Sequence, residues 1–242
     1  MALFDNLPAL RQVPSATAAQ MAEADRVASE ELGIPLDVLM ENASHQIASA
    51  ARLFLGGVAG KRIVAFAGSG NNGGDALGAL RHLSDWGAQV RAVLSGPPDR
   101  LRPLARRQHD ILAKLGVARS GAPVDDADLI LDGLLGYSVS GPPRDVVADL
   151  IRAANASRLP ILATDLPSGL HPDTGEPLGV TIRAALTVTL ALPKRGLIAT
   201  RSQALVGDLL LADIGVPPQA FDRLGIETRG LFDGGDLVRI IR

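Results

Sequence analysis

Residues 61–83, KRIVAFAGSGNNGGDALGALRHL, place an apolar run, a glycine-rich segment and an amphipathic run in direct succession. The run Lys61–Ala67 is rich in strand-forming residues and stops at the glycines, which predicts a buried strand. Residues 76–86 place leucines on one side at helical spacing and predict a helix. The segment between them, Gly68–Asp75, has glycines at the G-x-G-x-x-G spacing typical of a dinucleotide-binding loop. The stretch therefore predicts the strand, loop and helix of a nucleotide-binding α/β fold.

The same alternation of helical and strand patterns extends over the rest of the chain. Further helices are predicted at about residues 17–32, 36–54, 100–115 and 145–156. Further strands are predicted at residues 89–94, 128–131, 160–164, 186–192 and 208–212. This order favours one mostly parallel sheet with helices on both faces, preceded by two N-terminal helices. Because no repeat, low-complexity run or linker divides the chain, we expect a single domain over residues 1–242.

Composition excludes several classes of protein. The chain has 242 residues, of which 47% are hydrophobic, and its formal net charge is -2, so it carries no general attraction for nucleic acid or anionic membranes. It contains no cysteine, which excludes disulfides, thiolate metal sites and a cysteine nucleophile. The sequence shows neither a signal-peptide pattern nor an apolar run approaching the ~20 residues of a membrane span. We therefore expect a cytoplasmic protein.

Polar residues follow three of the predicted strands. They are the asparagines and aspartate of the glycine segment, Asp132 after the strand at 128–131, and Asp165 after the strand at 160–164. A single aspartate at such a place can be a helix cap or a turn residue. Ligands of parallel α/β sheets bind outside the carboxyl ends of the strands, however, and all three groups belong to that edge. Together they predict a binding site there.

The glycine segment differs from the usual NAD fingerprint. That fingerprint has an acidic residue ~20 positions further on, which holds the ribose. Here the next strand ends at Ser95 without one, while Asn71, Asn72 and Asp75 add polar side chains that the fingerprint does not require. The segment therefore predicts binding of more than a pyrophosphate, and a conventional NAD oxidoreductase is disfavoured.

Five segments carry motifs that are specific in combination. They are LMENA (39–43), GSGNNGGDALGALRHL (68–83), LDGLLGYS (131–138), DLPSGLHPDTG (165–175) and LTVTLALPKRGL (186–197). In this order they resemble the NAD(P)H-hydrate epimerase family, the YjeF N-terminal domain, and the resemblance extends from about residue 17 to residue 213. It implies a three-layer Rossmann-like fold, a homodimer, and epimerisation of the R and S forms of the hydrated dinucleotides NADHX and NADPHX. It also implies a bound potassium ion. The chain is expected to be the stand-alone form, because its length leaves no room for the dehydratase domain of bifunctional members.

The resemblance also implies roles for particular residues. Substrate contacts are implied for Asn71, Asn72, Gly73, Gly74, Asp75, Gly136, Tyr137, Ser138, Val139, Ser140, Gly141, Pro142 and Asp165. Potassium ligation is implied for Asn72, Asp132 and Ser168. Amide, carboxylate and hydroxyl oxygens are hard ligands that suit such a cation. Taken singly, these three residues have ordinary alternatives as a turn former, a cap and a turn hydroxyl.

Epimerisation requires proton transfer at the oxygen on C6 of the hydrate, whether the ring opens and closes or water is lost and regained through an iminium. Asp165 is the candidate general acid/base. Lys194 is the second candidate, as a charge partner of the substrate phosphate or of the acid/base group; the alternative is a solvated loop lysine.

One loop departs from the family. Gly136-Tyr137-Ser138 stands where Gly-Thr-Gly is frequent, so a loop expected near the ligand has the single tyrosine of the chain. The tyrosine ring could stack on the ligand or block its entry. A non-catalytic nucleotide-binding or scaffolding module of the same fold is therefore the alternative to an epimerase.

Overall fold

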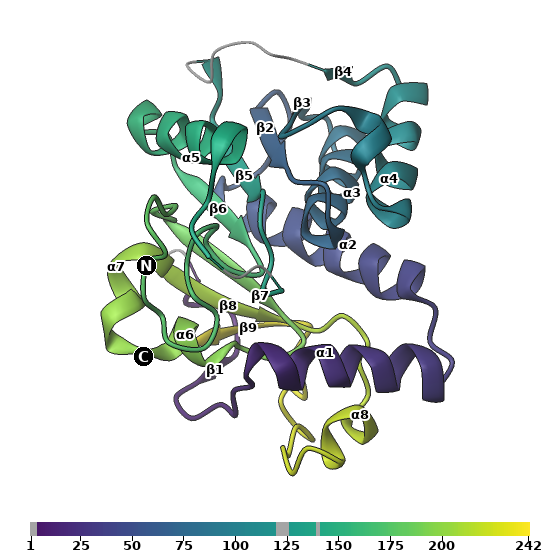
Figure 1. The fold of residues 1–242 in the computed structure, drawn as a ribbon, viewed down its shortest axis with the longest axis vertical. Coiled ribbons are helices and arrows are strands. Elements are labelled where there is room, and N and C mark those ends of the chain that lie inside the picture. Colours follow the sequence, from purple (N-terminus) through teal and green to yellow (C-terminus); the bar gives the residue numbers. More distant parts are fainter. Residues whose placement is uncertain (1–3, 120–125, 139–140) are drawn as a thin grey trace.

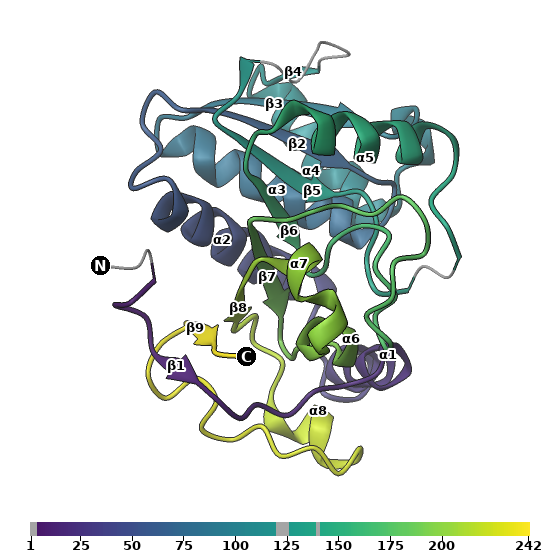
Figure 2. The same ribbon diagram turned by 90° about the vertical axis from the view of Figure 1, so that its left-hand side faces the viewer.

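A nine-stranded sheet runs through the computed structural model, which describes residues 4–119, 126–138 and 141–242 (Figures 1 and 2). The strands are β1 (Ala9–Leu10), β2 (Arg62–Ala67), β3 (Gln89–Leu94), β4 (Ala118–Arg119), β5 (Leu129–Gly133), β6 (Ile161–Thr164), β7 (Leu186–Leu190), β8 (Asp208–Ala212) and β9 (Leu237–Ile240). The α-helices are α1 (Ala18–Arg26), α2 (Leu36–Phe54), α3 (Asn71–Asp85), α4 (Pro103–Lys114), α5 (Asp145–Ser157), α6 (Arg195–Ile198), α7 (Gln203–Val206) and α8 (Pro218–Asp222).

The strand order places a topological switch point between β2 and β5. The sheet has the order β1-β9-β8-β7-β6-β5-β2-β3-β4, and neighbouring strands are parallel except for β8 and β9. From β2 the chain moves outward through β3 to β4, then returns to the other side of β2 and continues from β5 through β8. Loops diverge at such a point and leave a crevice at the carboxyl ends of the strands.

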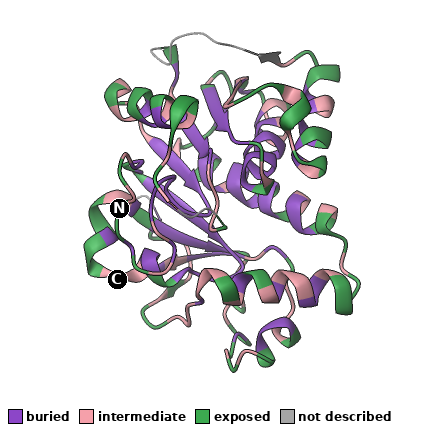
Figure 3. Cartoon of the chain, in the orientation of Figure 1, coloured by how far each residue is buried: buried purple, intermediate pink, exposed green. Residues whose placement is uncertain are grey.

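The central strands β2 and β5–β8 are buried on both faces of the sheet. In β2, Ile63 and Ala65 pack with α2 and α3, whereas Val64 and Phe66 pack with α5 on the other face. Figure 3 shows the central strands mostly as buried and the outward sides of the helices as exposed. A strand covered on both faces needs an almost uninterrupted apolar sequence, which explains the run Lys61–Ala67.

Most predicted elements are confirmed. All six predicted strands are present, and Thr17 is the N-cap of the first helix, with the predicted capping box to Gln20. The sequence did not predict β1, β4, β9 or the short helices α6, α7 and α8. Within residues 4–119, 126–138 and 141–242, none of the helices combines the length and apolar character needed to cross a membrane.

The predicted start of the helix after β2 was wrong. We expected Gly68–Asp75 to be a loop and the helix to begin at Ala76, but α3 begins at Asn71. Asparagine and glycine have low helix propensity, and tertiary packing overrides it here. A Cβ on Gly73 would lie 2.0 Å from the carbonyl oxygen of Gly68, so the first turn of α3 is packed against the end of β2. The polar residues of the segment therefore project from a rigid helical turn.

Replacing Gly73 with alanine should lower the free energy of unfolding by about 1–3 kcal/mol, because the added methyl group would overlap backbone at Gly68. Gly70→Ala is the matched control, since a Cβ there meets no atom within 4 Å and its φ is -88°. Urea denaturation of both variants measures the difference. Equal stability of the two variants would contradict the close approach.

Candidate active site

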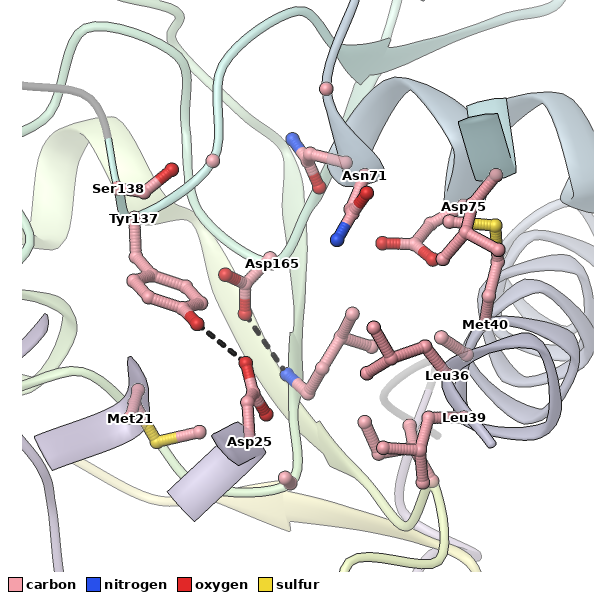
Figure 4. A pocket seen from close by; sticks show the side chains of 18 of the residues that line it. Met21, Asp25, Leu36, Leu39, Met40, Asn71, Asp75, Tyr137, Ser138 and Asp165 are labelled. Carbon is pink, nitrogen blue, oxygen red and sulfur yellow. Dashed lines mark hydrogen bonds between the residues drawn. The ribbon is translucent and has the colours of Figure 1, made fainter. Parts of the chain in front are cut away.

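A cavity of about 250 Å³ lies at the carboxyl ends of β2, β5, β6 and β7, at the switch point of the sheet. Its polar walls come from the first turn of α3, the loop after β5, the loop after β6 and the segment before α6. Its apolar wall comes from α2, through Leu36, Leu39 and Met40 (Figure 4). The site that the sequence predicted at this sheet edge is thus a defined hollow with one apolar side.

A buried ion pair between Asp165 and Lys194 lies in the cavity. Asp165 and Lys194 are 4% and 1% exposed, and the Lys194 ammonium donates a hydrogen bond to Oδ1 of Asp165. The backbone at Leu190 holds both groups: its N–H donates to Asp165 at 3.2 Å and its carbonyl accepts from Lys194 at 3.2 Å. Lys194 is therefore not a solvated loop lysine, because its charge is held beside the candidate acid/base group.

Asp165 occupies a left-handed backbone conformation, with φ of 65°. Non-glycine residues in this region are uncommon, and aspartate and asparagine are the side chains that enter it most readily. The turn after β6 thus aims the carboxylate at the cavity instead of continuing the strand.

Asp25 and Tyr137 form a second hydrogen-bonded pair in the wall of the cavity (Figure 4). The Tyr137 hydroxyl donates to the Asp25 carboxylate at 2.5 Å, and the Tyr137 ring centroid lies 5.5 Å from Nζ of Lys194. Burial raises the pKa of Asp25, partly offset by the hydrogen bond from Tyr137. Burial and the neighbouring Asp25 raise the pKa of Tyr137, which therefore stays protonated as the donor.

Asp25 is a site residue that was not predicted from the sequence. It lies on α1, one helical turn after Met21, and both residues line the cavity. The sequence contained one relevant pattern: Asp25 follows Met21 by four residues and so lies on the same, apolar side of the predicted helix. That signal is weak without knowledge of where α1 packs.

The first turn of α3 supplies three side chains and a helix N-terminus. Asn71, Asn72 and Asp75 line the cavity. Gly73 and Gly74 do not line the cavity but lie where α3 packs closely against neighbouring atoms. A Cβ on Gly74 would lie 2.6 Å from the terminal methyl of Met40. The N-terminus of α3 carries free amide groups and a partial positive charge, which suit a phosphate.

The loop after β5 contributes part of the stretch predicted to contact the substrate. Gly136, Tyr137 and Ser138 line the cavity, whereas Gly141 borders a separate small hollow and Pro142 lies outside both. Val139 and Ser140 lie outside the described residues.

Behind the cavity, the three predicted potassium ligands are brought together. The fully buried Asp132 carboxylate accepts from the Ser168 hydroxyl at 2.7 Å and from the Ser168 N–H at 2.8 Å. Asn72 donates to the Leu135 carbonyl at 2.9 Å, and its Oδ1 lies 2.9 Å from the Thr164 hydroxyl, which is 2.8 Å from the Asp132 carbonyl. These contacts join the loops after β5 and β6 to α3.

The donor set at this position suits a hard cation. It consists of amide, carboxylate and hydroxyl oxygens, which prefer group I and II ions. Within the described ranges, no three His, Cys, Asp or Glu side chains gather as they would for a zinc ion. Burial raises the pKa of Asp132 to about 6, and no cationic side chain contributes to that shift. A cation held by the neighbouring oxygens would stabilise the carboxylate.

Comparison with known proteins identifies the family to which the chain belongs. The sequence matches the family YjeF-related protein N-terminus over residues 36–196. The chain belongs to this family. It is 40% identical over 226 residues to the NAD(P)H-hydrate epimerase of Dehalogenimonas lykanthroporepellens, a match that covers 91% of this chain and 90% of that protein.

A longer relative and a solved structure also match the chain. The chain is 41% identical over 213 residues to the bifunctional NAD(P)H-hydrate repair enzyme Nnr of Moorella thermoacetica, a match that covers 83% of this chain and 40% of that protein. The crystal structure of yeast ynu0 superposes with a TM-score of 0.79 at 23% identity, covering 94% of this chain and 100% of that one. This structural match confirms the predicted fold class.

Replacing Lys194 with methionine should destabilise this YjeF-family protein by about 3–5 kcal/mol, because the Asp165 carboxylate would be left buried without its partner. Adding Asp165→Asn to Lys194→Met should recover much of that loss, since no charge would then remain at the site. Urea denaturation of both single variants and of the double variant measures the coupling. Additive losses would show that the pair is not energetically linked.

Proposed function

We propose that this protein is an NAD(P)H-hydrate epimerase, which interconverts the R and S forms of hydrated NADH and NADPH. The observation that carries the proposal is the 40% identity over 226 residues to a relative of that name, with 90% of the relative covered. The cavity supports it, because the carboxyl and ammonium groups of Asp165 and Lys194 lie in the same hollow as the first turn of α3. The single domain over residues 1–242, the homodimer and the cytoplasmic location stay predictions.

The dimensions of the cavity suit the nicotinamide end of the dinucleotide. Its volume of about 250 Å³ lies just below the ~300–1,000 Å³ of small-molecule pockets, so it would hold one end of the dinucleotide. The hydrated ring would lie against the apolar wall of Leu36, Leu39 and Met40 with its C6 atom beside Asp165. The phosphates would extend to the N-terminus of α3, where the exposed side chain of Arg102 also borders the cavity.

Asp165 would exchange a proton with the oxygen on C6 of the hydrate. Lys194 would hold the carboxylate in place and offset its charge, and the backbone N–H of Leu190 would orient it. Both routes considered from the sequence, ring opening and loss of water, require this transfer at the same oxygen.

Asn72, Asp132 and Ser168 would hold potassium behind the cavity. The ion would supply charge neutralisation for the buried carboxylate. Asn72 lines the cavity and Asp132 does not, so these residues would tie the substrate-facing turn of α3 to the loops that follow β5 and β6.

A non-catalytic nucleotide-binding module is the second candidate. The observation that favours it is the hydrogen bond from Tyr137 to Asp25, which connects the loop after β5 to α1 across the site. If this link does not open, a dinucleotide would reach only the outer part of the cavity.

The decisive experiment supplies the purified protein with the R hydrate of NADPH and follows formation of the S hydrate by chiral chromatography. Conversion well above the uncatalysed rate supports the epimerase. Binding of the dinucleotide without conversion would favour the module.

Asp165→Asn should retain dinucleotide binding and lose epimerisation by about 10²–10⁴-fold, because asparagine keeps the size of the side chain and cannot transfer the proton. Asparagine also tolerates the left-handed backbone at this position. Turnover and binding of NADP⁺ are measured separately. An unchanged rate would place the acid/base role elsewhere, and a joint loss of both would make Asp165 a ligand anchor.

Potassium should raise the unfolding free energy of the protein relative to an equal concentration of choline chloride. A concentration of ten times Kd corresponds to about 1.4 kcal/mol. Asp132→Asn and Ser168→Ala should abolish this response. Ser202→Ala is the matched control, because Ser202 is a buried serine whose hydroxyl donates to the Gly196 carbonyl at 2.6 Å, outside the proposed ion site. A potassium response that survives in both site variants would contradict the ligand assignment.

A further inference from the structure

The carboxyl group of Asp75 differs from the other carboxyl groups of the cavity. Asp75 projects from the first turn of α3 into the hollow and is only 8% exposed (Figure 4). Across residues 4–119, 126–138 and 141–242, its carboxyl group forms neither a hydrogen bond nor an ion pair; the contact from Ser44 reaches its backbone carbonyl. A carboxylate this deeply buried normally has a partner, so the group calls for an explanation.

The other two acidic side chains of the cavity have partners. Asp165 receives the Lys194 ammonium and the N–H of Leu190, and Asp25 receives the Tyr137 hydroxyl. The cavity thus holds three carboxyl groups around one buried ammonium group, and that ammonium is bonded to Asp165.

This charge distribution favours the neutral acid form of Asp75. Burial, followed by the negative charges of Asp165 and Asp25, raises the pKa of Asp75 well above its usual range, against the smaller opposing effect of Lys194. The remaining titratable or charged groups that border the hollow are Tyr137, which stays protonated, and Arg102, which is exposed at its edge. One carboxyl group held as the anion beside another held as the acid is the arrangement by which proteins assign base and acid roles.

We propose that Asp75 is the proton donor of the epimerase reaction, acting on the C6 hydroxyl of the hydrate while Asp165 acts as the base on the other side of the ring. This assignment rests on the proposed function and adds a residue to its chemistry. The assignment is based on the positions of two carboxyl groups in the hollow. Asp75 has no partner among the described residues, whereas Asp165 is paired with Lys194 (Figure 4).

The step balances without any further reactant. Asp75 transfers its proton to the C6 hydroxyl, the C6–O bond breaks with its electron pair going to oxygen, and water leaves. The lone pair of the ring nitrogen forms a C6=N1 iminium, whose positive charge the surrounding carboxylates stabilise. Water then bonds to C6 on the opposite face, the electron pair returns to nitrogen, and the Asp165 carboxylate accepts the released proton. Proton exchange through solvent restores both groups.

The test compares Asp75→Asn with Asp85→Asn, a control at an exposed position near the other end of the same helix. Asparagine resembles a neutral carboxylic acid in size and polarity but has no proton to transfer at neutral pH. We expect Asp75→Asn to lower kcat for R-to-S conversion by about 10²–10⁴-fold with little change in KM, and Asp85→Asn to leave both unchanged. In the unsubstituted protein kcat should fall as pH rises and Asp75 loses its proton, and the residual rate of Asp75→Asn should lack that fall.

A stability measurement tests the protonation state without reference to activity. A carboxyl group whose pKa is raised by folding contributes stability at low pH and loses it as pH rises from its unfolded pKa toward its folded pKa. The stability of Asp75→Asn relative to the unsubstituted protein should therefore increase with pH above about 4. Asp165→Asn should behave oppositely at neutral pH and destabilise the protein, because it strands the Lys194 ammonium.

The two proposals fail in different ways. If the unsubstituted protein epimerises the hydrate and Asp75→Asn does so at the same rate, or changes only KM, the proton-donor role is wrong while the function stands. A stability difference that stays flat with pH would equally overturn the neutral state of Asp75. If the unsubstituted protein shows no epimerisation, the proposed function fails, and the donor role fails with it.

Discussion

The Asp165–Lys194 ion pair is the interaction on which the arrangement of the site depends. Both groups are almost fully removed from water, so each would be strongly destabilising without the other. The pair forms because the left-handed turn at Asp165 directs its side chain toward the strand end at Leu190, where the chain also leads to Lys194. A single contact therefore links the loops that follow β6 and β7 and sets the charge of the cavity.

A second layer of polar contacts holds the loops in place behind that pair. Asp132 accepts both the hydroxyl and the N–H of Ser168, and the Thr164 hydroxyl lies between the Asp132 carbonyl and the Asn72 side chain. These residues come from β5, from β6 and the loop after it, and from α3, near the switch point between β2 and β5. The position of the cavity-lining residues thus depends on a buried polar network, and loss of any member leaves another group without its partner.

The cavity is completed by elements outside the parallel core. α1 brings Asp25 to Tyr137, and α2 supplies the apolar wall of Leu36, Leu39 and Met40. Tyr137, which distinguishes this loop from the common family pattern, therefore donates a hydrogen bond to an acidic residue on a separate helix. Three carboxyl groups in one hollow favour a cationic or proton-accepting ring over an anionic one, which agrees with chemistry at a hydrated nicotinamide.

Local patterns in the sequence determined the strands, the main helices and the polar edge of the sheet, since these depend on hydrophobic periodicity and on residues placed directly after apolar runs. They led to Asp165, Asp132 and the glycine segment.

Local patterns did not show that α3 starts at Asn71, because only the close packing of Gly73 on Gly68 makes a helix of residues with low helix propensity. Local patterns also could not predict the role of Asp25, since it contacts Tyr137, a residue 112 positions further along the chain. Charge pairing also depends on the fold. Asp75 and Asp165 are both aspartates next to apolar segments, but the folded chain brings Lys194 to Asp165, and the Asp75 carboxyl group has no partner among the described residues.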